Sequence, residues 1–188
     1  MDFEEYNGWP NFPTWDVFTA LTSYYETYQE LQRVVDSASP SKAGRAVEQF
    51  VKYIVAAWKE GESTGHEEAV HVLIQDFIMN GVRRVNWTLV YDLLRGERPT
   101  LGKTDELTAL AYGLLQSVDW RSVVADAEYL TQADNMLRDW LQDQCLTWIE
   151  SPDARMYQSQ TAVFANKVLE IYFGVVNWKQ VASAIRGA

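Results

Sequence analysis

The sequence contains little of what most catalytic and redox sites are built from. Among its 188 residues there are one cysteine, Cys145, and two histidines. One cysteine excludes an internal disulfide, and Cys145 lies in the apolar register of a helix pattern, which is typical of a small buried hydrophobic side chain. The chain contains no glycine-rich phosphate loop, serine nucleophile elbow or Cys/His cluster. We therefore predict a protein that is not an enzyme, with no catalytic or cofactor-binding residue.

The two histidines belong to one segment, HEEAVH at residues 66–71. It invites comparison with the His-Glu-x-x-His zinc motif, but His66 and His71 are five residues apart rather than four. At about 100° per residue, five positions separate two side chains by roughly 140° around a helix. Side chains so placed do not share a metal ion, so the sequence predicts no zinc site here.

Long hydrophobic runs are also missing. No apolar stretch approaches the ~20 residues that a membrane-spanning helix needs. The opening residues MDFEEYN have neither the basic nor the apolar region of a secretory signal. We therefore expect a cytoplasmic, soluble protein without membrane contact.

Positive charge is scarce, and the net charge is −10. Two zones hold most of the excess, because residues 1–36 and residues 126–153 each carry seven acids and one base. An acidic surface repels nucleic acid and attracts basic protein surfaces. The composition therefore disfavours direct nucleic-acid binding and favours a partner protein with a basic surface.

What the sequence does contain is helical periodicity along nearly all of its length. No segment shows the sustained two-residue alternation of a β-strand, so we predict an all-α helical bundle of about nine helices. The first helix is expected over residues 13–38. The second helix is expected to begin at Ser39-Pro40, with serine as N-cap and proline in the first turn. The third is expected to begin at a capping box formed by Thr64 and Glu67 and to end at Asn80-Gly81.

A tripeptide, Val-(Asn/Asp)-Trp, occurs three times, each time after an apolar helix and before a short one. Its middle residue is a favoured N-cap, and a valine before the cap can pack on the valine four residues after it as a hydrophobic staple. The tryptophan can then cover the end of the preceding helix. The motif residues are Asn86 and Trp87, Asp119 and Trp120, and Asn177 and Trp178.

The repetition extends beyond this tripeptide. Residues 46–60 match residues 136–150 in apolar register, which places Trp58 over Trp148. We therefore expect two related helical halves, residues 1–97 and 98–188, packed as one compact pseudo-symmetric domain. Their joint is expected in GERPTLGKT, at residues 96–104, where glycine and proline interrupt any helix.

The opening segment NGWPNFPTW, residues 7–15, resembles the Asn-Gly-Trp-x-Asn-Tyr-x-Thr-Trp signature of an uncharacterised family of small proteins from phages, plasmids and bacteria, including cyanobacteria. Members also tend to close with a Val-Asp-Trp-x-x-Ile-Ala segment, and the counterpart here is either Val85-Asn86-Trp87 or Val176-Asn177-Trp178. The resemblance implies a helical fold and a mobile-element setting, but no activity. Where family members have Leu-Trp and an Asn-Asp pair, this chain reads LTSYY. In residues 7–15 we expect Asn11 to cap the first helix, and Trp9 and Trp15 to flank its start and pack on the bundle.

Two acidic faces are candidates for partner binding. Asp139, Asp143 and Glu150 fall within about 40° of one another around a helix, at a spacing that resembles that of strand phosphates. A second face joins acids to tyrosines, which are common at protein interfaces. Its residues are Tyr24, Glu26, Tyr28 and Glu30. Either face could instead be an ordinary solvated helix surface.

We expect a protein-binding module of phage or mobile-element origin that inhibits a basic, nucleic-acid-handling host protein, such as a defence effector. This hypothesis depends on the charge distribution, the absent catalytic motifs and the family resemblance. The alternative is a structural or adaptor protein that binds its own copies or another protein through the tyrosine-rich face. Binding through acidic faces should weaken with salt, and apolar association should not.

Overall fold

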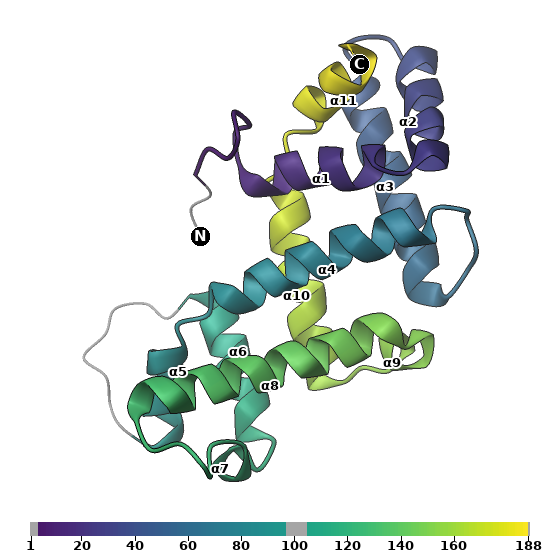
Figure 1. Ribbon diagram of the computed structural model, residues 1–188. Coiled ribbons are helices and arrows are strands. Elements are labelled where there is room, and N and C mark those ends of the chain that lie inside the picture. The colour runs from purple at the N-terminus through teal and green to yellow at the C-terminus, as the bar shows by residue number, and fades with distance from the viewer. Residues whose placement is uncertain (1–3, 97–104, 188) are drawn as a thin grey trace. The chain divides into compact units, whose positions relative to one another are not determined.

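The computed structural model describes residues 4–96 and 105–187. Every regular element in these two ranges is a helix (Figure 1), which confirms the all-α class. The described residues form eleven helices rather than about nine. They are α1 (Phe12–Thr22), α2 (Tyr25–Ser37), α3 (Ala43–Glu60), α4 (Glu67–Arg83), α5 (Trp87–Leu94), α6 (Glu106–Gln116), α7 (Trp120–Val123), α8 (Leu130–Glu150), α9 (Pro152–Met156), α10 (Gln160–Gly174) and α11 (Trp178–Gly187).

The helix predicted over residues 13–38 is two helices, so that prediction was wrong. The break falls after Thr22, where the Ser23 hydroxyl donates to the Thr19 carbonyl at 2.6 Å. Tyr24 then takes an extended backbone conformation, with φ −108° and ψ 118°. A serine that bonds back to its own helix competes with the backbone ladder, and the apolar periodicity continues across the break and hides it.

Two other boundaries differ from the prediction. Helix α3 begins at Ala43 rather than at Ser39-Pro40, because residues 39–42 form a turn in which the Ser39 carbonyl accepts the N–H groups of Lys42 and Ala43. Helix α4 continues past Asn80-Gly81 to Arg83. A Cβ atom on Gly81 would lie 2.6 Å from Val168 Cγ1, so this glycine permits close packing and does not stop the helix.

The predicted caps are confirmed at two of the three Val-(Asn/Asp)-Trp motifs. The side chain of Asn86 accepts the Leu89 N–H at 3.0 Å, and that of Asn177 accepts the Gln180 N–H at 3.1 Å. The indole of Trp87 donates to the Val82 carbonyl at 3.1 Å and so covers the end of α4. The valine pairs of these two motifs are buried: Val85 with Val90, and Val176 with Val181.

The third motif departs from the prediction. Asp119 makes no side-chain cap bond, and the helix that follows, α7, spans four residues. The Asp119 main-chain carbonyl instead accepts both the N–H and the hydroxyl of Ser122. Trp120, half-buried, lies edge-on to Tyr91 at 6.1 Å and under the Arg121 guanidinium at 4.8 Å. This copy therefore keeps the sequence pattern without the Asp119 cap.

The chain divides into two compact units that do not coincide with the predicted halves 1–97 and 98–188. Unit 1 comprises residues 1–77 and 170–188, and unit 2 comprises residues 78–169. Helices α4 and α10 each contribute residues to both units. The predicted joint at residues 96–104 lies outside the described residues except for Gly96.

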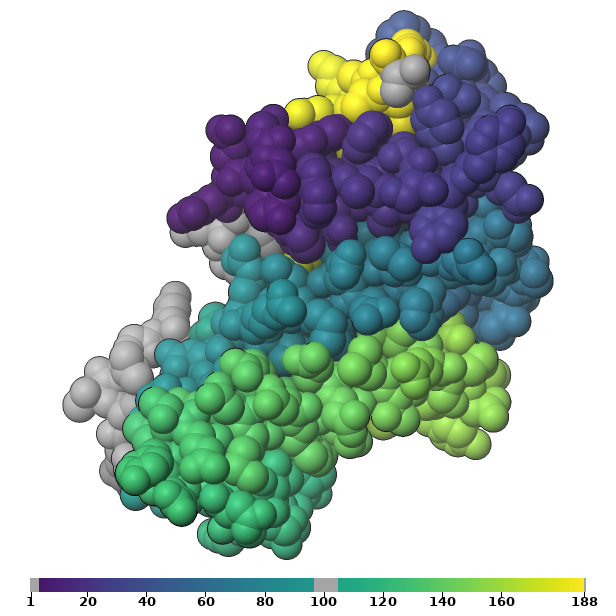
Figure 2. Space-filling model, viewed as in Figure 1, coloured from purple at the N-terminus to yellow at the C-terminus, as the bar shows by residue number. Residues whose placement is uncertain are grey.

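In each unit, the last helix of one predicted half packs against helices of the other predicted half. In unit 1, α11 packs on α1, α2 and α3 (Figures 1 and 2), although most of the chain separates them in sequence. In unit 2, α5 packs on α6 and α8. Since α5 and α11 are the helices that follow equivalent Val-Asn-Trp motifs, the two halves have exchanged their last helices within one chain.

A hydrogen-bonded clamp holds the exchanged helix in unit 1. Asn11 caps α1 by accepting the N–H and the hydroxyl of Thr14 on Oδ1, at 2.9 and 2.7 Å. The buried Thr14 hydroxyl in turn accepts the Asn177 N–H at 2.9 Å, and Asn11 Nδ2 donates to the Val175 carbonyl at 3.0 Å. NGWPNFPTW therefore caps the first helix and also binds the segment that starts the last one.

Unit 2 contains an equivalent clamp. Asp105 accepts the N–H of Thr108 at 3.0 Å on one carboxylate oxygen and the Thr108 hydroxyl at 2.6 Å on the other. The Thr108 hydroxyl then accepts the Asn86 N–H at 3.0 Å. Asn11-x-x-Thr14 and Asp105-x-x-Thr108 are thus two copies of one motif.

The tryptophans divide between core and surface. Trp58, Trp87 and Trp148 are buried, and the matched register of α3 and α8 is visible in the buried pairs Val47 and Leu137, Val51 and Leu141, and Val55 and Cys145. The remaining motif tryptophans, Trp9, Trp15, Trp120 and Trp178, are half-buried. Trp9 lies 5.0 Å from Phe18, and Trp15 lies 4.9 Å from Tyr6.

Candidate functional site

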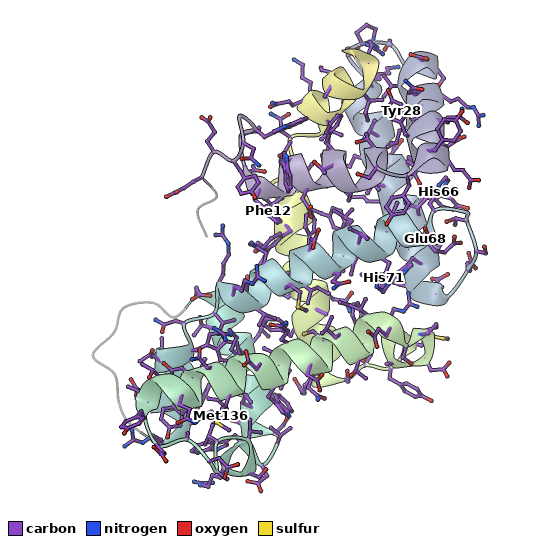
Figure 3. The ribbon with its side chains drawn as sticks, viewed as in Figure 1. Phe12, Tyr28, His66, Glu68, His71 and Met136 are labelled. Carbon is purple, nitrogen blue, oxygen red and sulfur yellow. The ribbon has the colours of Figure 1, made fainter. Side chains whose placement is uncertain are left out.

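Unit 1 contains a surface groove of about 500 Å³, which we name the α2–α4 groove. One wall is the start of α2, and the other is the loop before α4 together with the first turn of α4. Figure 3 shows His66 and Glu68 at this end of α4. The lining residues are Tyr24, Tyr25, Glu26, Thr27, Gly65, His66, Glu67, Glu68 and Ala69.

A second hollow of about 300 Å³ adjoins the groove, and we name it the Trp58 hollow. Tyr24, Glu67 and Glu68 line both spaces. Trp58, His71 and Val72 complete the smaller one. Together the two spaces offer aromatic rings and carboxylates, and none of the residues that line them is a lysine or an arginine.

Local sequence explains why the α4 wall is well defined. The Glu67 carboxylate accepts the N–H groups of Thr64 and Gly65, the latter at 3.1 Å. Gly65 permits this turn with a φ of +80°. Hydrogen bonds from backbone N–H groups, its own first and that of Thr64 next, lower the pKa of Glu67 to about 2. The predicted capping box is half formed. The Glu67 carboxylate accepts the Thr64 N–H, but the Thr64 hydroxyl accepts the His66 N–H, at 3.4 Å, rather than the Glu67 N–H.

The two histidines contact side chains of neighbouring helices. The Nδ1 atom of His66 lies 3.1 Å from the Thr27 hydroxyl, and its ring meets Phe50 edge-on at 5.4 Å. His71 meets Trp58 edge-on at 6.3 Å. In residues 4–96 and 105–187 no group of three or more His, Cys, Asp or Glu side chains is arranged to hold a metal ion.

The tyrosine-rich face predicted from the sequence is divided by the structure. Tyr24 and Glu26 line the groove. Tyr28 lies further along α2 (Figure 3), where its hydroxyl accepts Gln32 Nε2 at 2.7 Å. Glu30 forms an ion pair with Arg33 at 2.7 Å. Tyr28 and Glu30 are therefore engaged within their own helix and do not line the groove.

The acidic stripe lies on α8 in unit 2. Asp139, Asp143 and Glu150 are all exposed there, as their spacing predicts. Arg138 donates to Asp139 Oδ1 from Nε at 3.1 Å and from Nη2 at 2.9 Å, which offsets part of the charge of the stripe. None of the three lines the groove or the Trp58 hollow.

Sequence reasoning missed much of the α4 side of the groove. In the sequence, HEEAVH suggested only a zinc motif, and Glu67 suggested only a helix cap. The useful signal was the loop between Gly61 and Gly65, which leads directly into two acids and a histidine at a helix start. The prediction for Cys145 is confirmed: the thiol is fully buried, and burial raises its pKa to about 12.

The described ranges contain no helix long and apolar enough to cross a membrane. Comparison of the chain with protein-family models, curated proteins and solved structures finds no match. The resemblance of residues 7–15 to the phage and plasmid family therefore stays a prediction, and the α2–α4 groove is the main basis for a functional proposal.

Proposed function

We propose that this protein is a non-enzymatic binding module that recognises a basic surface of a partner protein through the α2–α4 groove. The observation that carries the proposal is the lining of the groove. Three acids and two tyrosines surround a space of about 500 Å³ without a lysine or arginine among its lining residues. That combination complements a cationic segment in both charge and shape.

Two of the groove carboxylates are available for a partner. Glu67 is engaged by backbone N–H groups, but within the described residues no hydrogen bond or ion pair engages the carboxylates of Glu26 and Glu68. Both are exposed. A partner cation can therefore pair with either one without breaking an existing contact.

The tyrosines supply area that a charge pair alone lacks. Tyr25 is 72% exposed, and Tyr24 is half-buried between the groove and the Trp58 hollow. Tyrosine contributes large contact surfaces with few rotatable bonds, and for this reason it is enriched at interfaces. The groove thus offers the aromatic and charged groups found at protein-binding surfaces.

The partner that we propose is a basic, nucleic-acid-handling protein of a bacterial host, which the module inhibits or modulates by covering a cationic surface. Support comes from the net charge of −10 and from the mobile-element setting that residues 7–15 imply. The alternative is a structural or adaptor role. It depends on the same exposed tyrosines and predicts association that resists salt.

The test is capture of partners from nuclease-treated host lysate at low and high salt, with three versions of the protein. Glu26→Gln with Glu68→Gln removes two groove charges. The control, Asp139→Asn with Asp143→Asn and Glu150→Gln, removes three charges from α8. We expect one basic protein to be captured at low salt, the groove variant to lose about tenfold in affinity, and the α8 variant to bind as wild type.

Two results would contradict the proposal. If the α8 variant loses binding and the groove variant does not, the acidic stripe and not the groove binds the partner. If capture resists high salt or yields only further copies of this chain, the adaptor alternative holds.

A further inference from the structure

We infer that the Trp58 hollow is an arginine-binding subsite, into which one arginine side chain of the partner inserts. This inference rests on the proposed function and deepens it, because it names the residue type that the module recognises. Three features of the hollow support it: its aromatic walls, its carboxylates and its size.

The walls suit a flat cation. Tyr24, Trp58 and His71 present three aromatic rings around one space, and the Trp58 and His71 rings are already fixed edge-on at 6.3 Å. Trp58 is 5% exposed, so it forms a buried wall that does not need to reorganise on binding. A guanidinium group stacks on such rings through cation–π attraction, and it is more weakly hydrated than an ammonium group.

The carboxylates at the hollow provide the second half of the recognition. Glu67 and Glu68 line it, and the backbone hydrogen bonds that lower the pKa of Glu67 keep that carboxylate ionised. Glu68, exposed and one residue further along α4, is the group free to pair (Figure 3). Guanidinium forms two parallel hydrogen bonds with a carboxylate, a geometry that ammonium does not match.

The size of the hollow matches one side chain rather than a folded element. Its volume of about 300 Å³ is at the lower limit of ligand pockets. It opens beside the larger groove, since Tyr24 and Glu68 line both. An extended basic segment lying in the groove can therefore insert one long side chain into the hollow.

The fold does not require these acids. Helix α10 corresponds to α4 in the repeat, although the short helix α9 lies between α8 and α10. The first eight residues of α10 are QTAVFANK, with no acid. Unit 2 thus repeats the scaffold without carboxylates at this helix start. No hydrogen bond or ion pair within the described residues engages the Glu68 carboxylate, so it is available to pair with a ligand cation.

The test uses N-acetylarginine amide as probe and N-acetylcitrulline amide as its neutral, nearly isosteric control, titrated into the intact ¹⁵N-labelled protein. We expect arginine to shift the amide signals of Tyr24 and of Glu67 through Val72 together with the Trp58 indole signal. Citrulline should leave them unchanged. N-acetyllysine amide should bind about fivefold more weakly than arginine, because it lacks the planar fork.

Variants locate the site. Glu68→Gln should weaken arginine binding by roughly tenfold, through loss of the charge-assisted bonds. Glu62→Gln removes one exposed acid from the same loop but not from the hollow, and it should bind arginine as wild type does. Equal binding of citrulline, tighter binding of lysine, equal losses for the two variants, or arginine shifts on α8 would each overturn the inference.

The outcome also separates this inference from the proposed function. If arginine fails to bind but Glu26→Gln with Glu68→Gln still loses the partner, the groove binds a basic protein without an arginine subsite. If arginine binds at the hollow but no partner is captured through the groove, the subsite stands and the proposed function fails.

Discussion

At the residue scale, the least expected group is Asp16, a carboxyl that is 2% exposed on α1. Its Oδ2 atom has no hydrogen-bond partner among the described residues. Burial, the charge of Asp76 on α4 and a hydrogen bond with Asp76 raise the pKa of Asp16 from 3.8 to about 8. Folding therefore keeps a proton on this acid at neutral pH.

This proton makes stability depend on pH. Below about pH 4 both folded and unfolded chains hold it, and above about pH 8 both have lost it. Between these values only the folded chain holds it, so the free energy of unfolding falls as pH rises, by up to about 1.4 kcal/mol per pH unit.

Asp16→Asn should remove this dependence. We expect the urea midpoint of the variant, relative to wild type, to rise steadily between pH 5 and pH 8, because asparagine needs no proton to remain neutral. The exposed Asp36→Asn serves as control and should show no such trend. Parallel pH curves for Asp16→Asn and wild type would show that Asp16 is not protonated in the folded protein.

At the element scale, two copies of one motif start helices in different ways. Asn86 bonds the Leu89 N–H, and Asp119 makes no cap bond. Asn86→Ala should therefore lower the free energy of unfolding by about 1 kcal/mol, and Asp119→Ala should change it little. Chemical denaturation of the two variants tests this. Equal losses would mean that the motif stabilises both helices by a means other than the side-chain cap.

The packing of α11 on α3 depends on a glycine. A Cβ atom at Gly44 would lie 2.9 Å from the Lys179 backbone. Gly44→Ala should force the two helices apart and lower the free energy of unfolding by about 1–3 kcal/mol. A stable Gly44→Ala protein would contradict the close approach.

At Gly113 on α6 a Cβ atom would meet nothing within 4 Å, so Gly113→Ala should stabilise the protein by about 0.5–1 kcal/mol.

At the scale of the whole molecule, the exchange of closing helices makes a long-range prediction. Thr14→Val leaves the Asn177 N–H without its acceptor, and the loss of this partly buried hydrogen bond should cost about 1 kcal/mol. Hydrogen exchange should then speed up in α11, some 160 residues away, and in the unit 1 helices around it. Exchange in α5 should stay at the wild-type rate.

Thr108→Val is the matched variant in unit 2. It removes the acceptor of the Asn86 N–H and should speed up exchange in α5 and α6, with α11 unchanged. If each variant instead loosened the half of the sequence in which it lies, the exchanged arrangement would be wrong. The two variants together test which helix closes which unit.

The sequence by itself determined the helical class, the buried register of α3 and α8 and the caps at Asn86 and Asn177. These depend on contacts within a few residues, and a 3.6-residue period or a cap side chain shows them directly. It did not reveal the break at Ser23, because the apolar pattern continues through it. Nor did it show that Gly81 serves close packing and not helix termination.

Only the tertiary structure decided which elements pair. The repeat indicated two halves, but the closing helix of each half packs in the unit built largely by the other, and no local pattern records that choice. The groove has the same origin, because Tyr24 and Glu68 are 44 positions apart in sequence and become neighbours only when α2 and α4 pack in unit 1. Local periodicity specifies which face of a helix is buried, and long-range packing specifies what buries it.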